Sequence, residues 1–303
     1  MPRSPFKLFK APAAKIPLTL TDRHYLILHT VGTYKFITSQ LTAALLIENV
    51  HDPVVRGNKT GEVLKRAMTD LFRHGYLARP PVQVLFRQMT QGSHELIYTL
   101  TPKGRAALTD KYPNLSQTLI DPSRDVQIPA MLHTLMIARY RVTLTKALHQ
   151  TQPQLQLKAW QQGKHLKSLV TVQGRRTPVI PDAFFTITNL ARPTGANTAP
   201  FFLEADRSTM SLTRFKRKLQ AYAIYKATGS HTTQHGIQGF RVLTITPSKE
   251  RRDNLRQLAA TLPLAGAFWF AHEQDFDPWH PETILQPIWV TGKHPEPREL
   301  LPP

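Results

Sequence analysis

Residues 60–77, TGEVLKRAMTDLFRHGYL, carry the clearest indication of the fold of the first half of the chain. Their apolar side chains recur at spacings of three and four residues: Val63, Leu64, Ala67, Met68, Leu71 and Phe72. This period predicts an amphipathic helix over residues 60–74, with one face in a core. Gly75 suits the left-handed conformation that often ends a helix. Basic and polar side chains cover the other surfaces of the predicted helix.

Two shorter helices are predicted upstream of this stretch. Thr21 and Asp22 are good N-caps for a helix that breaks at Gly32. A second helix is predicted from residue 38 or 39 through Leu46. The predicted order at this end of the chain is therefore helix, helix, helix.

Downstream of Gly75 the period changes to that of strands. Residues 76–84 and 95–101 are rich in strand formers and flank the polar stretch 87–94, which predicts a hairpin with a long loop. Thr101 and Pro102 then open another helix, as N-cap and first helical residue.

Three helices followed by a two-stranded wing resemble the winged helix-turn-helix class. The residues that carry the resemblance are Leu71, Gly75, Tyr76 and Leu77, then Tyr98, Leu100, Thr101 and Gly104. The resemblance implies that the third helix enters the major groove and that the wing touches the backbone or minor groove. The candidate DNA contacts are then Lys59, Thr60, Lys65, Arg66, Thr69 and Arg73, with Arg87 on the wing. Some winged helices bind protein instead, but residues 1–150 carry a net charge of +11, which favours DNA.

Charge also points to nucleic acid for the whole chain. The 303 residues hold 39 Lys and Arg against 20 Asp and Glu, a net charge of +19. A polyanion such as double-stranded DNA is the leading partner, and an ordinary basic protein is the alternative. No apolar run approaches the ~20 residues that a membrane span needs, and the absence of Cys excludes disulfides and thiolate metal sites. We expect a cytoplasmic protein that acts as a homodimer or within a larger protein complex.

The length suits two domains, and prolines and capping residues place the linker at 113–129. We expect a basic arm over 1–18, a winged helix over 19–112, a second domain over 130–292 and a flexible tail over 293–303. The second domain is predicted to contain helices at 130–149, 211–227 and 248–261, with strands at 155–160, 177–188, 200–206, 240–246 and 267–271. The fold class is therefore mixed α/β, an α/β/α sandwich around a mixed sheet.

The second half brings carboxylates to two consecutive strands. Asp182 begins one predicted strand, and Glu204 and Asp206 end the next, before a Lys-rich helix. Two carboxylates on adjacent strands can hold a hard divalent cation such as Mg²⁺ or Mn²⁺. A nearby lysine can then orient water or stabilise the charge on a phosphate. The alternative is that these residues are ordinary strand-end charges.

This arrangement resembles the PD-(D/E)xK nuclease superfamily, in which Asp182 and Glu204 match the metal ligands. The third position departs from the pattern, because it is Asp206 and not lysine. In some branches the lysine has moved to the following helix, where Lys216 or Lys218 could serve. Gln220 and Tyr222 lie nearby, as in the helix motif of recombination-type nucleases.

The full set of motifs, over about residues 20–260, resembles the replication-relaxation family of plasmids and mobile elements. Its most specific part is Glu204-Ala205-Asp206-Arg207 followed by Lys218 and Tyr222. The resemblance implies a role in plasmid DNA replication, relaxation or mobilisation. One hypothesis is a metal-dependent DNA endonuclease or nickase, acting alone or in a larger mobile-element complex. The alternative is a non-catalytic replication factor or transcriptional regulator that uses a degenerate nuclease fold as a DNA clamp.

Overall fold

The computed structural model describes residues 17–46, 59–84, 95–120, 126–151 and 154–301. The chain divides into two compact units, Met1–Val142 and Thr143–Pro303. Both contain helices and sheet, which confirms the mixed α/β class. The division falls inside the long helix α7 (Ile128–Thr151), whereas the sequence places the linker at 113–129.

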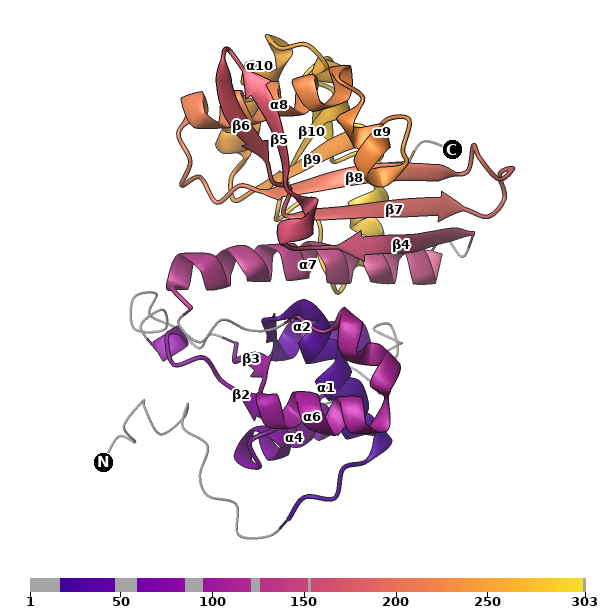
Figure 1. Cartoon of the computed structure of the whole chain (residues 1–303). Helices are drawn as coiled ribbons and strands as arrows, with labels where there is room; N and C mark the ends of the chain where they lie inside the picture. Colours follow the sequence, from indigo (N-terminus) through magenta and orange to yellow (C-terminus); the bar gives the residue numbers. More distant parts are fainter. Residues whose placement is uncertain (1–16, 47–58, 85–94, 121–125, 152–153, 302–303) are drawn as a thin grey trace. The chain divides into compact units, whose positions relative to one another are not determined.

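The first unit alternates helices with short strands (Figure 1). The helices among its described residues include α1 (Asp22–Tyr34), α2 (Ser39–Leu46), α4 (Lys59–Arg73) and α6 (Pro102–Lys111), followed by the 3-10 helix η2 (Pro113–Thr118). Strands β1 (Ile37–Thr38), β2 (Leu77–Ala78) and β3 (Ile97–Leu100) form an antiparallel sheet in the order β1-β3-β2. The helices predicted from residue 22, from residue 39 and over 60–74 are confirmed.

Helix α4 buries one apolar face, as its period predicts. Leu64, Ala67, Met68, Leu71 and Phe72 are each at most 7% exposed. Val63 lies outside this face at 39% exposed, so the buried face is narrower than the sequence suggests.

A tight junction links the end of α4 to the start of α6. Gly75 takes a φ of 73°, and the Thr101 hydroxyl donates to its carbonyl oxygen at 2.7 Å. The same hydroxyl accepts from the Gly104 amide at 3.0 Å and so caps α6. A Cβ at Gly104 would lie 2.1 Å from the Tyr76 carbonyl oxygen, so this position needs glycine. The Thr-x-x-Gly spacing thus has a steric cause.

The predicted strand over 76–84 is wrong beyond its first residues. Strand β2 ends at Ala78, and Pro80 and Pro81 follow without the amide hydrogens that a sheet needs. Gln83 begins a helical turn, and its side chain replaces a strand by pairing with both the amide and the carbonyl of Ile97, each at 3.0 Å. The predicted wing loop lies outside the described residues.

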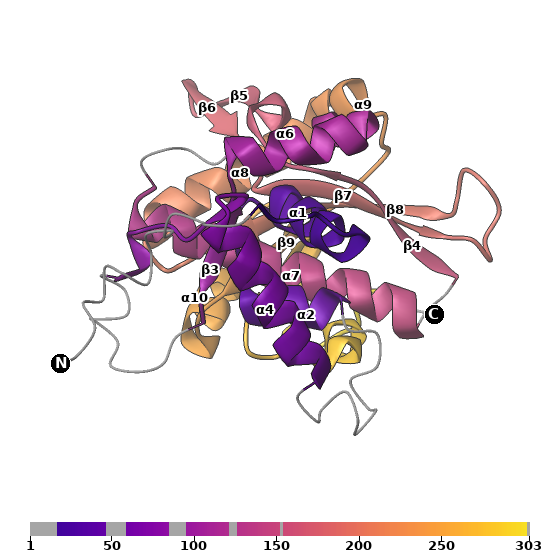
Figure 2. The ribbon, with the colours of Figure 1, turned by 90° about the horizontal axis from the view of Figure 1, so that it is seen from below.

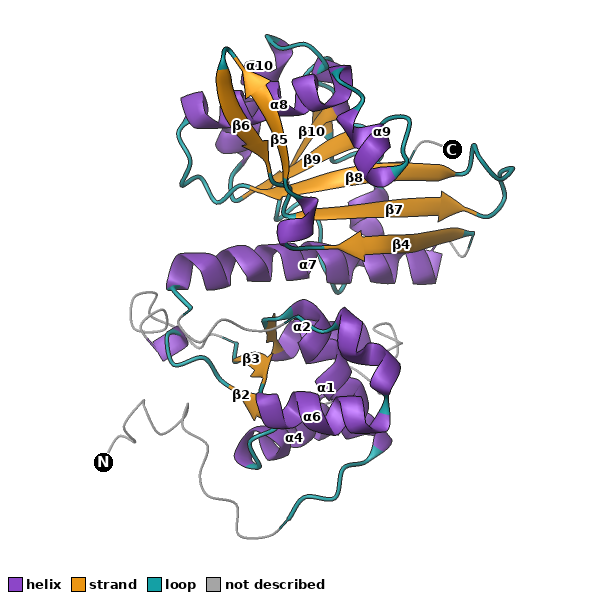
Figure 3. Ribbon diagram, viewed as in Figure 1, coloured by secondary structure: helices purple, strands orange, loops and turns teal. Residues whose placement is uncertain are grey.

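The second unit is built on a six-stranded mixed sheet in the order β11-β10-β9-β8-β7-β4 (Figure 3). Its strands are β4 (Leu155–Gln161), β7 (Ala183–Asn189), β8 (Thr198–Ala205), β9 (Arg241–Thr246), β10 (Phe268–His272) and β11 (Val290–Thr291). Strands β8, β9 and β10 are parallel, and the other neighbours pair antiparallel. A separate two-stranded ribbon consists of β5 (Ser168–Val172) and β6 (Arg175–Val179).

Helices α8 (Leu212–Ala227) and α10 (Lys249–Ala260) share one core with the sheet. This core joins Phe202 and Phe268 of the sheet to Phe215 and Leu219 of α8 and Leu255 of α10. The β5–β6 ribbon contributes its valines to the same core. Because α8 and α10 connect parallel strands, this is the packing that crossover helices require.

Several details of the second unit differ from the sequence prediction. The predicted strand 177–188 is two strands, because the chain turns at Ile180 and Pro181 between β6 and β7. Strand β5, the short helix α9 (Ser230–His235) and strand β11 were not predicted. Residues 293–301 are not a free tail: the backbone of Arg298 pairs with Trp289, and Leu300 is fully buried.

Candidate functional site

The pairing of β7 with β8 brings Asp182 and Glu204 together. Ala183 lies opposite Leu203, so Asp182 stands just before β7, at the level of Glu204. The Asp182 amide donates to the Leu203 carbonyl at 2.9 Å, and its carboxylate accepts from the Ala205 amide at 2.8 Å. The two carboxylates predicted as a pair are thus neighbours across two strands.

Glu204 is buried and held by two side chains of α8. Its side chain is 2% exposed. The Lys218 ammonium donates to one carboxylate oxygen, and the Tyr222 hydroxyl donates to the other at 2.5 Å. Lys218 and Tyr222 are four residues apart, so they lie on one face of α8. Both oxygens of Glu204 therefore have protein donors.

Burial and charge shift the proton equilibria of this cluster in opposite directions. Burial raises the pKa of Glu204 to about 7, the Lys218 ammonium opposes this shift, and Asp182 adds to it. Burial lowers the pKa of Lys218, but the carboxylates of Glu204 and Asp182 raise it more, so its net pKa is above the usual value. Burial also raises the pKa of Tyr222, which keeps its hydroxyl a donor. Glu204 therefore titrates near neutral pH.

Asp206 is engaged elsewhere. Its carboxylate accepts from Arg251 of α10 through Nε at 2.6 Å and Nη2 at 3.3 Å. Arg251 also donates to the Met210 carbonyl at 2.7 Å. Asp206 thereby ties the end of β8 to α10. Sequence reasoning missed Arg251, because an arginine on a predicted helix gives no sign of its partner 45 residues away.

Of the other predicted residues on α8, neither Lys216 nor Gln220 lies on the face that meets Glu204. Each is two residues from Lys218, about 200° around the helix. Both are half-buried. The structure therefore brings Lys218 and Tyr222 to the carboxylates, and leaves Lys216 and Gln220 on another side of α8.

The carboxylate oxygens of Asp182 and Glu204 are suitable ligands for a hard cation, but the arrangement of these side chains is not suitable for one. Mg²⁺ requires about six oxygen ligands in near-octahedral geometry. Both Glu204 oxygens already accept hydrogen bonds, one of them from the Lys218 ammonium. Within the described ranges, no group of three His, Cys, Asp or Glu side chains could hold a metal ion. As arranged, these residues do not fit a divalent cation.

Three of the candidate DNA contacts on α4, Lys65, Arg66 and Arg73, are exposed. Lys65 and Arg73 form surface ion pairs with Glu62 at 3.1 Å and Asp70 at 3.8 Å, and Arg66 is exposed. The Thr69 hydroxyl donates to the Lys65 carbonyl at 2.8 Å. Lys59 and Thr60 begin α4, and Arg87 lies outside the described residues.

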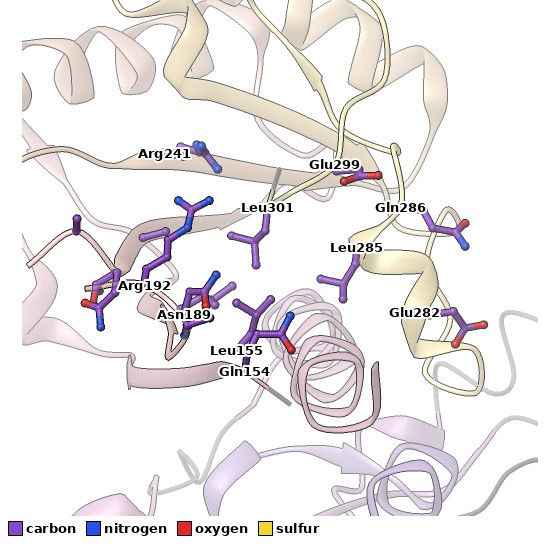
Figure 4. A pocket seen from close by; sticks show the side chains of 16 residues that line it. Gln154, Leu155, Asn189, Arg192, Arg241, Glu282, Leu285, Gln286, Glu299 and Leu301 are labelled. Atoms are coloured by element: carbon purple, nitrogen blue, oxygen red, sulfur yellow. Dashed lines mark hydrogen bonds between the residues drawn. The ribbon is translucent and has the colours of Figure 1, made fainter. Parts of the chain in front are cut away.

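A pocket that the sequence did not predict opens at the far end of β7 and β8 (Figure 4). Its volume is about 620 Å³. Asn189 and Thr198 line it, at the opposite strand ends from Asp182 and Glu204. Arg192 and Arg241 lie on one side of it, and Glu282 is also in its lining. Because the lining contains both basic and acidic side chains, it does not indicate one class of ligand.

The protein is therefore a two-unit α/β protein whose second unit contains a cluster of Glu204 with Asp182, Lys218 and Tyr222. Residues 28–240 match the family described as replication-relaxation, and because this is more than half of the chain, the chain belongs to that family. This membership points to a role in the replication or relaxation of plasmids or mobile elements. No curated protein and no solved structure matches the chain. No helix among the described residues is long and apolar enough to cross a membrane.

Proposed function

We propose that this protein binds double-stranded DNA through its first unit and acts in the replication or relaxation of plasmid or mobile-element DNA. The observation that carries the proposal is α4, which buries one apolar face and leaves Lys65, Arg66 and Arg73 exposed. Among the described residues, the order helix, strand, helix, helix and hairpin strands supports a winged helix, a class in which this helix reads DNA. A net charge of +19 favours the same partner.

Titration of a duplex of about 30 base pairs at several salt concentrations tests this proposal. Reversal of charge in Lys65→Glu with Arg66→Glu should flatten the salt slope by about 2, because each lost phosphate contact removes about 0.9. The matched control is Arg23→Glu with Lys111→Glu, which changes the same charge on exposed residues of α1 and α6. Equal slopes for the two variants would contradict the assignment of α4 as the DNA reader.

For the second unit we propose a grip on DNA without metal-dependent cleavage. Two observations on Glu204 support the absence of metal-dependent cleavage. Its carboxylate oxygens accept hydrogen bonds from two protein donors, and its side chain is buried, so a cation has no access to it. Asp206, at the position where the nuclease pattern has lysine, supports it too, because Arg251 holds its carboxylate. Such a clamp needs the fold of a nuclease, but not its chemistry.

A metal-dependent nickase is the second candidate, and the convergence of Asp182, Glu204 and Lys218 favours it. This function requires Lys218 to release Glu204 when Mg²⁺ or Mn²⁺ and DNA are present. The test is nicking of supercoiled plasmid by the wild type, Asp182→Ala and Glu204→Ala, with either metal or with chelator. The clamp predicts no nicking by the wild type. Metal-dependent nicking that both substitutions abolish would establish the enzyme instead.

A further inference from the structure

Acidic residues are nearly absent from a long part of the second unit. From Lys158 to Lys249 the sequence has 14 basic residues: Lys158, Lys164, Lys167, Arg175, Arg176, Arg192, Arg207, Arg214, Lys216, Arg217, Lys218, Lys226, Arg241 and Lys249. The acidic residues of this stretch are Asp182, Glu204 and Asp206. Two of them are buried, and Asp182 is half-buried and bonded to the Ala205 amide. The exposed side chains of this stretch therefore carry one sign of charge.

The β5–β6 ribbon presents part of this charge at its tip. Gln173 and Gly174 both have positive φ, 48° and 76°, as a two-residue hairpin turn requires. Arg175 and Arg176 follow the turn directly, and both are exposed. Arg176 pairs across the ribbon with Thr171, which is also exposed. The turn thus places both arginines at the tip of the ribbon, Arg176 on the face of Thr171 and Arg175 on the face of Val172.

The ribbon has an inner face and an outer face. Val170, Val172 and Val179 are buried in the core shared with α8. On the other face, Leu169 is 50% exposed and lies opposite the exposed Pro178. Since the inner face packs against the core, it cannot contact a partner. Its outer face and its tip remain available to a partner.

Helix α8 continues the positive surface beside the ribbon. Figure 1 shows the ribbon lying against α8, and the two share one core cluster. Arg214 and Arg217 are exposed on α8. Among the described residues, neither these two arginines nor Arg175 and Arg176 have a partner in an ion pair. Four guanidinium groups are therefore available to an anion.

We propose that the tip and outer face of the β5–β6 ribbon and the exposed arginines of α8 form a second DNA-contact surface, which binds the phosphates of a duplex. This inference rests on the proposed function, because it takes duplex DNA as the partner of the first unit. Guanidinium groups match phosphate oxygens in geometry and charge. The absence of exposed carboxylates among their neighbours in sequence removes the repulsion that would weaken this contact.

The experiment compares three variants of the full chain in salt titrations with one duplex. Arg175→Glu with Arg176→Glu and Arg214→Glu with Arg217→Glu remove the surface, and Arg192→Glu with Arg298→Glu is the control. The control changes the same charge on exposed residues of the second unit away from the ribbon. Each surface variant should lose affinity at least about tenfold at physiological salt and lower the salt slope by about 2. The control should keep both values near those of the wild type.

The outcomes separate this inference from the proposed function. Wild-type binding with ribbon variants equal to the control would overturn the second surface and leave the first unit as the DNA reader. No wild-type binding would overturn both. Arg175→Gln with Arg176→Gln removes charge without reversing it, and its slope should still fall by about 2. If the variants instead lost only binding to phosphatidylserine vesicles, the surface would belong to a membrane, and the inference would be wrong.

Discussion

At the scale of single residues, two ion pairs with buried carboxylates in the described part of the second unit have different consequences. Asp206 and Arg251 form a two-bond pair between β8 and α10. Glu204 and Lys218 form a pair that also involves Tyr222 and a neighbouring carboxylate. The first pair fixes two elements to each other, and the second leaves a carboxyl group that titrates near neutral pH.

Removal of one partner from the first pair should be costly. Arg251→Met leaves the Asp206 carboxylate buried without its cation, and we expect a loss of about 3–5 kcal/mol in the free energy of unfolding. Lys65→Met removes the exposed pair with Glu62, and its cost should stay below about 1 kcal/mol. Chemical denaturation measures both. Equal losses would show that Asp206 is not held as the structure indicates.

The titration of Glu204 should appear in the pH dependence of stability. Burial raises the pKa of Glu204 from 4.5 to about 7. Because the folded state then binds the proton more tightly, this stabilisation is complete below about pH 4.5 and is lost as the pH rises through about 7. We expect the unfolding free energy of the wild type to fall by about 1–3 kcal/mol more than that of Glu204→Gln between pH 5 and pH 8. Parallel pH profiles of the two proteins would exclude this titration.

At the scale of elements, glycines in the first unit have opposite roles. A Cβ at Gly104 would meet the Tyr76 carbonyl oxygen at 2.1 Å, whereas a Cβ at Gly61 in α4 would have nothing within 4 Å. The junction between α4 and α6 therefore depends on close backbone contact. Helix α4, by contrast, has a glycine that weakens it.

Alanine at these two positions should change stability in opposite directions. Gly104→Ala forces the backbone of α6 away from Tyr76 and should destabilise the first unit by about 2–4 kcal/mol. Gly61→Ala should stabilise it by about 0.5–1 kcal/mol, because alanine loses less conformational freedom in a helix. Thermal unfolding of both variants checks this. A neutral Gly104→Ala would mean that the junction is looser than described.

At the scale of the whole molecule, both units carry a net positive charge, +10 over residues 1–142 and +9 over residues 143–303. If each unit contacts DNA at its own surface, the losses in the salt slope should add. The chain with Lys65→Glu, Arg66→Glu, Arg175→Glu and Arg176→Glu should show a slope lower by about 4, because independent sites contribute independently. Salt titration of this variant beside its two parents measures the sum. If the salt slope of this fourfold variant equalled that of one of the two double variants, the two units would not bind the same duplex.

The helices and most strands of both units could be predicted from the sequence, because their apolar periods and caps are local signals. The sequence also indicated Asp182 and Glu204 as a pair, since consecutive strands bring their ends to one side of a sheet. The sequence of helix α8 did not indicate which lysine would meet Glu204. Lys216 and Lys218 were equal candidates until the packing of α8 on the sheet selected the face that meets Glu204.

The partners of several buried side chains depend on the tertiary fold and not on local sequence. Arg251 reaches Asp206 across 45 residues of sequence, and no local pattern encodes such a contact. The Gln83 side chain that pairs with Ile97, and the buried Leu300 in a proline-rich end, are of the same kind. Periodicity reports which side chains face a core, but the partner of a buried polar group depends on which elements pack together, and this is settled only in the folded chain.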